Sequence, residues 1–226
     1  MVAKANITVA IEPRLLKKAR AVAARRGQSV SALLADELRE LVDEDSRYTA
    51  ARKRALSLLE NPLPLGGVPL RREELHERRR LRDSTILIYA HDLDAGVKRE
   101  LAMAKLRELW DSGTGRLSVQ VLQEFYVNVT QKLATPIAAS TAREVIRTYG
   151  VWVHHATTVE TVARATEISE LALISFWDAL VVASAEEVDA DELLSEDLND
   201  GQSIAGIKVV NPLKINHMVN EAKGGR

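Results

Sequence analysis

The chain has 226 residues, more than one average domain of about 100–200 residues uses, so we expect two units. Its 46% hydrophobic and 28% charged residues are typical of a folded, water-soluble protein, and only 4% aromatic residues predict an aliphatic core. The absence of cysteine excludes disulfides, thiolate metal sites and cysteine nucleophiles, and it favours a reducing cytoplasm. We expect neither export nor membrane insertion, because no signal-type segment and no apolar run of about 20 residues is present.

The formal net charge of −1 hides an uneven distribution. Residues 1–82 carry 18 Lys and Arg against 11 Asp and Glu, and residues 83–226 carry 13 against 21. A basic segment of this kind suits a nucleic acid or an acidic partner, whereas the acidic remainder suits a carboxylate-rich site.

The first 45 residues read as one strand followed by two helices. Apolar side chains alternate over residues 6–11, which predicts a strand with one buried face. Helices are predicted from Pro13 to Gly27 and from Ser29, a plausible N-cap, to about residue 45. Because so few residues cannot bury an adequate core and a lone strand lacks partners, we expect a homodimer or a higher even oligomer that pairs strand with strand.

This order, with Gly-Gln-Ser-Val-Ser between the helices, resembles the ribbon-helix-helix family of bacterial repressors and antitoxins over residues 5–45. The resemblance implies that a two-stranded ribbon enters the major groove of operator DNA. In that arrangement Asn6, Thr8 and Ala10 would face base edges, and the backbone near Ser29 and Ser31 would meet phosphates. An ordinary amphipathic dimerisation unit is the alternative.

Residues 46–82 read as a connecting arm. A basic, helix-compatible stretch is followed by three prolines and two glycines within residues 61–69, which break regular structure. The next residues, R-R-E-E-L-H-E-R, resemble the toxin-binding ends of antitoxins. The resemblance implies an inhibitory arm made of Arg71, Arg72, Arg78, Arg79 and Arg80, whereas a solvated charged helix is the alternative.

The second half alternates predicted strands with predicted helices. The strands are expected at residues 85–89, 116–119, 151–155, 192–195 and 207–211. The helices are expected at residues 97–110, 121–131, 159–168 and 176–185. This rhythm predicts an α/β fold, a mostly parallel sheet flanked by helices, with ligands at the carboxyl ends of the strands.

Four acids fall at comparable places in this alternation: Asp83, Glu124, Asp178 and Asp197. Converging carboxylates repel one another unless a divalent cation neutralises them, and oxygen ligands without cysteine favour Mg²⁺ or Mn²⁺ over Zn²⁺. A metal held by acids can activate water for phosphodiester cleavage. For any one acid, a salt bridge or a helix cap is the alternative.

The segments around these acids resemble the PIN-domain ribonucleases, in particular the toxins of VapBC-type toxin–antitoxin pairs, over residues 83–213. The matching segments are D-S-T-I-L-I-Y-A-H-D from residue 83, L-Q-E-F-Y from 122, I-S-F-W-D-A-L from 174 and L-S-E-D-L-N-D-G-Q from 194. The resemblance implies a PIN-like sheet, catalytic metal ligands at the four acids and an auxiliary ligand at Asp200. Thr85 replaces the family's usual Asn, and Arg80 and Arg82 fit poorly in a buried first strand.

Together these features predict three parts: residues 1–45 for DNA binding and dimerisation, 46–82 as arm and linker, and 83–226 as a PIN-like nuclease domain. The function expected is a fused toxin–antitoxin protein, a Mg²⁺-dependent endoribonuclease that cleaves RNA and is neutralised by its own arm, in cis or in trans. The alternative is a DNA-binding transcriptional regulator whose nuclease-like half is a catalytically weak or inactive scaffold.

Overall fold

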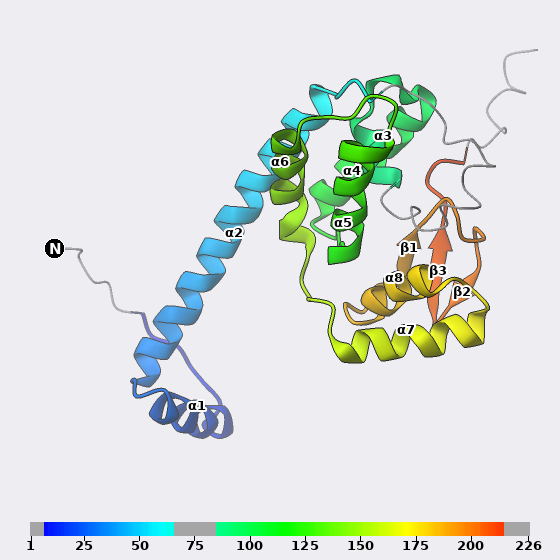
Figure 1. Cartoon of the computed structure of the whole chain (residues 1–226). Coiled ribbons are helices and arrows are strands. Elements are labelled where there is room, and N and C mark those ends of the chain that lie inside the picture. The colour runs from blue at the N-terminus through cyan, green and yellow to red at the C-terminus, as the bar shows by residue number, and fades with distance from the viewer. Residues whose placement is uncertain (1–6, 66–84, 215–226) are drawn as a thin grey trace, which may run out of the picture. The chain divides into compact units, whose positions relative to one another are not determined.

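The computed structural model describes residues 7–65 and 85–214, and helices account for 65% of those residues (Figure 1). Contacts along the chain divide it into two compact units, Met1–Thr49 and Ala50–Arg226. We describe each unit by itself. The predicted three-part division stays a prediction, because the boundary at residue 82 lies outside the described residues.

The first unit contains α1 (Pro13–Arg25) and the beginning of α2 (Val30–Glu60). Pro13 opens α1, and Gly27, at φ 67°, takes the left-handed conformation that follows the helix. Ser29 Oγ accepts a hydrogen bond from Ala32 N at 3.1 Å, so the predicted N-cap of the second helix is confirmed. The predicted end near residue 45 is wrong, because residues 46–60 contain neither glycine nor proline and the helix continues to Glu60.

This first unit has almost no core of its own. In its described residues only Ala23 and Leu33 are buried. The strand predicted over residues 6–11 is not formed in its described part, residues 7–11. A strand there would need a partner strand from another molecule, and that pairing stays a prediction. The large apolar side chains left exposed are Ile7, Val9, Leu15, Leu34, Leu38, Leu41 and Val42.

The second unit is mainly helical. Its helices are the end of α2, α3 (Thr85–His91), α4 (Val97–Ser112), α5 (Val119–Val127), α6 (Ala139–Tyr149), α7 (Val159–Ala172) and α8 (Phe176–Glu186). Short helical turns occur at Leu93–Ala95, Asn128–Lys132 and Gly150–Trp152. The strands are β1 (Glu192–Leu194), β2 (Ser203–Ile204) and β3 (Ile207–Val210). In Figure 1 helices α3 to α6 lie above α7, α8 and the sheet.

The expectation of an α/β, PIN-like, mostly parallel sheet is wrong. The sheet has three short strands in the order β1-β3-β2, with β1 parallel and β2 antiparallel to β3. The strand predicted at residues 85–89 is instead helix α3, and neither 116–119 nor 151–155 forms a strand. The predicted strands at 192–195 and 207–211 are confirmed as β1 and β3, and the four predicted helices of this half are confirmed.

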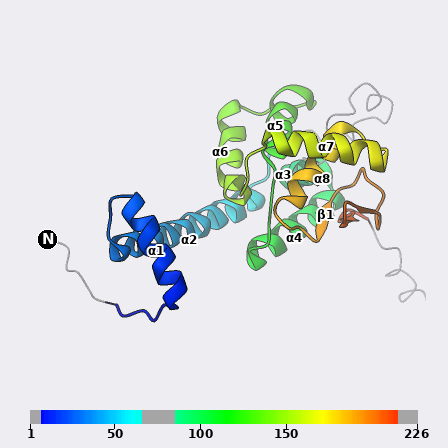
Figure 2. The same ribbon diagram turned by 90° about the horizontal axis from the view of Figure 1, so that it is seen from below.

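Two side-chain clusters make up the core of the second unit. Aliphatic residues of α7 and α8 pack against the sheet, and α7 runs alongside α8 (Figure 2). Most buried side chains of the described residues are aliphatic, as expected, but the upper helices also enclose a cluster of rings that the low aromatic content did not predict. Its rings are those of His91, Trp110, Phe125, Tyr149 and Trp152, with centroids of neighbouring rings 4.4–6.5 Å apart.

The beginning of the predicted arm belongs to this second core. Ala51, Ala55 and Leu59 of α2 are buried there, and Leu65 is 1% exposed. Leu63 N donates to His91 O at 2.8 Å, which ties the chain after α2 to the end of α3. Residues 61–65 are therefore a packed segment and not a solvated linker.

In the part of the chain that the structure describes, no single helix is long and apolar enough to cross a membrane. Taken together, α7 and α8 reach that length and composition, but they meet at a bend of 117°.

Candidate functional site

Two of the predicted acids meet between α5 and α8. Glu124 lies in the second turn of α5, whose N-cap Ser118 accepts a hydrogen bond from Val121 N. Asp178 is the third residue of α8 and is only 7% exposed. The N-cap Ser175 fixes it, because Ser175 Oγ accepts from Asp178 N at 3.2 Å and donates to Asp178 Oδ2 at 2.7 Å.

Gln120 joins the two elements that carry these acids. Its Nε2 donates to Glu124 Oε1 at 2.8 Å and to the backbone oxygen of Trp177 at 3.3 Å. One amide group therefore orients the Glu124 carboxyl and also holds the first turn of α8 in place. Both carboxyl groups are positioned by neutral donors.

The electrostatics show that the two carboxyls lie close enough to influence each other. Burial, together with the nearby charge of Asp178, raises the pKa of Glu124 to about 7, against the lowering effects of Gln120 and Lys132. At neutral pH Glu124 is therefore only partly ionised. A cation bound at the pair would remove the repulsion. We call Glu124 and Asp178 the acid pair.

The acid pair fits a magnesium ion by its chemistry. Mg²⁺ binds through one or two carboxylates and completes its shell with water and substrate oxygens. In residues 7–65 and 85–214 no group of three or more acidic or histidine side chains could hold a metal. The structure thus brings Glu124 and Asp178 together but does not join Asp197 or Asp200 to them. Asp83 lies outside the described residues.

Asp197 and Asp200 lie in the loop after β1. Ser195 Oγ accepts hydrogen bonds from the backbone of Asp197 and Leu198, which folds this loop back on the strand end. Asp200 accepts from Asn211 N at 2.8 Å and from Lys214 Nζ at 2.7 Å, and Lys214 lowers its pKa. Asp200 thus fastens the loop to the end of β3, a structural role that differs from the auxiliary ligand that the resemblance implies.

Residues that the sequence did not single out also hold this region together. Lys98 Nζ donates to Tyr89 Oη at 3.0 Å and to Glu196 at 2.9 Å, so it links α3, α4 and the loop after β1. Gln120 and Ser175 were missed as well. A signal existed for Ser175, since a serine three residues before an acid at a helix start is typical of an N-cap.

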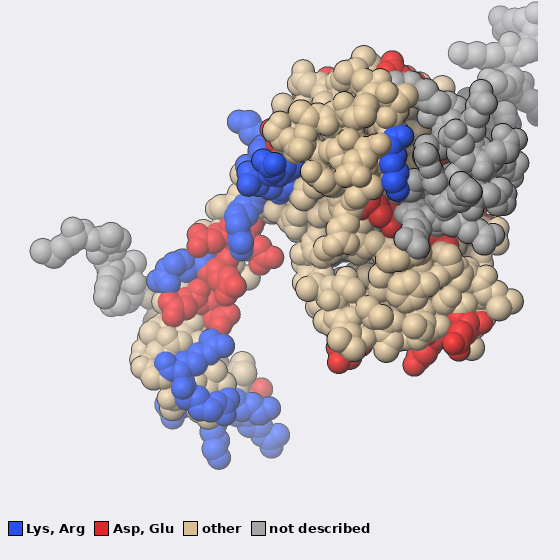
Figure 3. Space-filling view, viewed as in Figure 1, with Lys and Arg blue, Asp and Glu red and all other residues tan. Residues whose placement is uncertain are grey.

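The predicted DNA-binding residues lie in the first unit. Thr8, Ala10 and Ser31 are exposed, Ser29 caps α2, and Asn6 lies outside the described residues. Helix α1 is a further basic surface that was not named among the predicted DNA-binding residues, and Figure 3 shows Lys and Arg gathered on it. Its exposed basic side chains are Arg14, Lys17, Lys18, Arg20 and Arg25. The five arginines of the predicted inhibitory arm lie outside the described residues.

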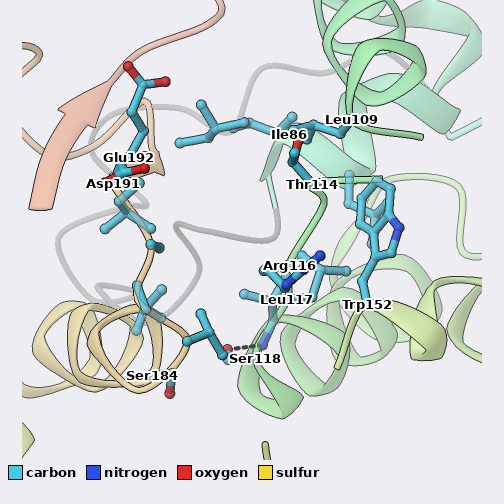
Figure 4. Close-up of a pocket in the computed structure, with 18 of the residues that line it drawn as sticks. Ile86, Leu109, Thr114, Arg116, Leu117, Ser118, Trp152, Ser184, Asp191 and Glu192 are labelled. Atoms are coloured by element: carbon cyan, nitrogen blue, oxygen red, sulfur yellow. Dashed lines mark hydrogen bonds between the residues drawn. The ribbon is translucent and has the colours of Figure 1, made fainter. Parts of the chain in front are cut away.

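A cavity of about 640 Å³ lies elsewhere in the second unit (Figure 4). Arg116 and Ser118 line one side, and Asp191 and Glu192 at β1 line the other. Neither Glu124 nor Asp178 borders it. The lining mixes basic, acidic and aliphatic side chains, so it selects no class of ligand. We therefore place the candidate site at the acid pair and not in the cavity.

Comparison with known proteins gave no match: no family model fits the chain, and neither a curated protein nor a solved structure is significantly similar to it.

Proposed function

We propose that this protein is a metal-dependent endoribonuclease joined in one chain to a DNA-binding dimerisation unit, a fused toxin–antitoxin protein of the VapBC type. The observation that carries the proposal is the acid pair: two carboxyls from different helices, held by neutral donors, with the pKa of Glu124 raised to about 7. Two carboxyls that repel each other cost stability, and their common use is to bind a divalent cation. The proposal does not rest on a PIN-like sheet.

The residues have distinct roles in this proposal. Glu124 and Asp178 hold Mg²⁺ or Mn²⁺, and Asp83, which lies outside the described residues, is the further ligand. The metal, when bound, supplies an acidified water and neutralises the charge of the phosphodiester. Ser175 orients Asp178, and Gln120 orients Glu124. The arginines at 71, 72, 78, 79 and 80 compete with the metal for these acids.

The first unit supplies dimerisation and operator binding in the same proposal. Its exposed apolar side chains need a partner, and a second copy would cover them while pairing residues 6–11 of the two chains. Thr8 and Ala10 would then lie on the outer face of the ribbon. The basic side chains of α1 suit contact with phosphates.

The test compares RNA cleavage by the full chain with cleavage by a full-chain variant in which the five arm arginines are alanine, here called the arm variant. With Mg²⁺ the arm variant should cleave single-stranded RNA faster than the unaltered chain, and EDTA should abolish cleavage. Asp178→Asn in the arm variant should reduce the rate at least about 100-fold, since even changes to the partners of metal ligands cost up to that much. Glu170→Gln, a change of an exposed carboxylate on α7, is the matched control.

The second candidate is a DNA-binding regulator whose second unit is an inactive scaffold. It is favoured by one observation, that the described residues bring together two acids and not three or more. In that case operator DNA would bind, while neither the full chain nor the arm variant would cleave RNA with Mg²⁺ or Mn²⁺. Metal-dependent cleavage that Asp178→Asn removes would exclude it.

A further inference from the structure

Trp177 directly precedes Asp178 of the acid pair in α8, and its side chain is partly open to solvent. Of the three tryptophans in the chain, Trp110 and Trp152 are 1% exposed, whereas Trp177 is 38% exposed. Trp177 directly precedes Asp178, and its backbone oxygen accepts from the amide of Gln120 that also donates to Glu124. Its backbone is therefore fixed relative to both acids.

Side chains near Trp177 in the sequence include a ring neighbour and exposed leucines. The ring of Phe176 packs edge-on against the indole of Trp177, with the ring centroids 5.4 Å apart, and this contact restrains the indole. Leu171, in the last turn of α7, is 82% exposed, and Leu173, between α7 and α8, is 90% exposed with a φ of 54°. The start of α8 thus presents a restrained, partly exposed aromatic ring on the residue before Asp178.

We infer that Trp177 is a base-stacking residue that positions single-stranded RNA over the acid pair. The inference rests on the proposed function and deepens it by naming the form of the substrate. An unpaired nucleobase stacks on an aromatic side chain in a sequence-tolerant way, and the backbone of that nucleotide then lies beside the ring. With Trp177 one residue from Asp178, the adjoining phosphate comes to the acids. A base within a duplex is already stacked, so the ring selects against double-stranded RNA.

Tryptophan fluorescence tests this directly, because the other two tryptophans are buried. The protein is the full-chain arm variant carrying Asp178→Asn, which prevents cleavage during the titration. A short oligouridine should quench the emission on binding, and the same strand in a duplex with oligoadenylate should quench it much less. In a Trp177→Leu version, oligouridine should bind about 5- to 100-fold more weakly, as judged by anisotropy of labelled RNA.

Two further variants separate stacking from structure. In the cleaving arm variant, Trp177→Leu should raise KM with little change in kcat, and Trp177→Phe should restore most of the loss. Glu170→Gln, a change of an exposed side chain on α7, should leave RNA affinity unchanged. Equal affinity of the Trp177→Leu variant, or quenching by duplex equal to that by single strand, would overturn the inference. So would an oligomeric state that changes with Trp177→Leu while RNA affinity does not.

The inference and the proposed function fail in different ways. If the arm variant cleaves RNA and Trp177→Leu changes neither KM nor affinity, the stacking role is wrong and the nuclease stands. If no variant cleaves RNA but oligouridine binds and quenches Trp177, the nuclease proposal is wrong and the stacking role stands. If oligouridine does not bind, the inference is wrong whatever the cleavage result.

Discussion

His91 is a titratable side chain held neutral in the core of the second unit. It is fully buried, lies 3.3 Å from Tyr149 Oη and packs edge-on to Phe125. Burial first, and then the charge of Arg99, lower its pKa to about 4. Because the unfolded chain protonates this histidine near pH 6.5 and the folded chain does not, stability should fall as the pH drops from about 6.5 to about 4.

Urea unfolding at neutral pH and near pH 4.5 measures this effect. The unaltered chain should lose on the order of 2 kcal/mol more stability over this interval than His91→Gln, which cannot titrate. Carboxylates titrate in the same interval, but they contribute equally to both proteins, so the difference isolates His91. Equal pH slopes for the two proteins would contradict the prediction.

Gly115 lies against the face of an indole. A Cβ atom at this position would come within 2.4–2.7 Å of three ring atoms of Trp152, closer than atoms can approach without a shift. Trp152 is buried among Trp110 and Tyr149 and cannot move aside. Gly115→Ala should therefore destabilise the fold by about 1–3 kcal/mol.

Gly150→Ala is the matched control for Gly115→Ala. Its Cβ would meet nothing within 4 Å, and its φ of −59° suits alanine. This change should be neutral or stabilise the fold by up to about 1 kcal/mol. Thermal unfolding of the two variants tests this prediction. Equal melting temperatures would contradict it and would show that the indole of Trp152 can shift to make room.

At the scale of single side chains, the sequence predicted the acid pair but not its surroundings. Glu124 and Asp178 were nominated from a resemblance of their segments to PIN-domain ribonucleases, which stays a prediction. Asp200 came from the same resemblance, yet Lys214 and Asn211 N occupy its carboxylate. Such partners are distant in the chain, and a single sequence does not reveal them.

At the scale of secondary structure, the turn between α7 and α8 contains a strained backbone conformation that lowers stability. Leu173 has a left-handed backbone, which costs a residue with a side chain roughly 1 kcal/mol, and its own side chain gains nothing by packing. Leu173→Gly should raise the free energy of unfolding by about 0.5–1 kcal/mol. Leu173→Ala, which keeps the strain, should leave it nearly unchanged. Chemical denaturation of both variants measures the difference.

Helix α3 shows why the strands of the second half were mispredicted. It is buried on nearly all sides, including Ile86, Leu87 and Ile88, so its sequence is a continuous apolar run like that of a buried strand. Periodicity cannot distinguish the two in so short a segment. Helix α6 was missed for a different reason, since its two threonines and other weak helix formers obscured the helical spacing of Ala142, Val145 and Tyr149.

At the scale of the whole molecule, the first unit should determine oligomeric state. Leu34, Leu38 and Leu41 form an exposed apolar stripe on α2, and the unit buries too little surface to be stable alone. The full chain should therefore be a dimer or a higher even oligomer in sedimentation equilibrium, and Leu38→Glu should dissociate it. Glu40→Ala, on an exposed polar position of the same helix, should not. A monomeric unaltered chain at micromolar concentration would contradict this prediction.

Because of where the tryptophans lie, near-ultraviolet and far-ultraviolet circular dichroism report on different parts of the protein. All three lie in the second unit, and the rings of Trp110 and Trp152 are 4.4 Å apart, close enough for coupled transitions in near-ultraviolet circular dichroism. Far-ultraviolet dichroism detects the helices of both units, whereas the aromatic signal comes mostly from the second. If the units melt independently, the two spectral regions will give different transition temperatures in one sample, and coincident curves will show a single cooperative transition.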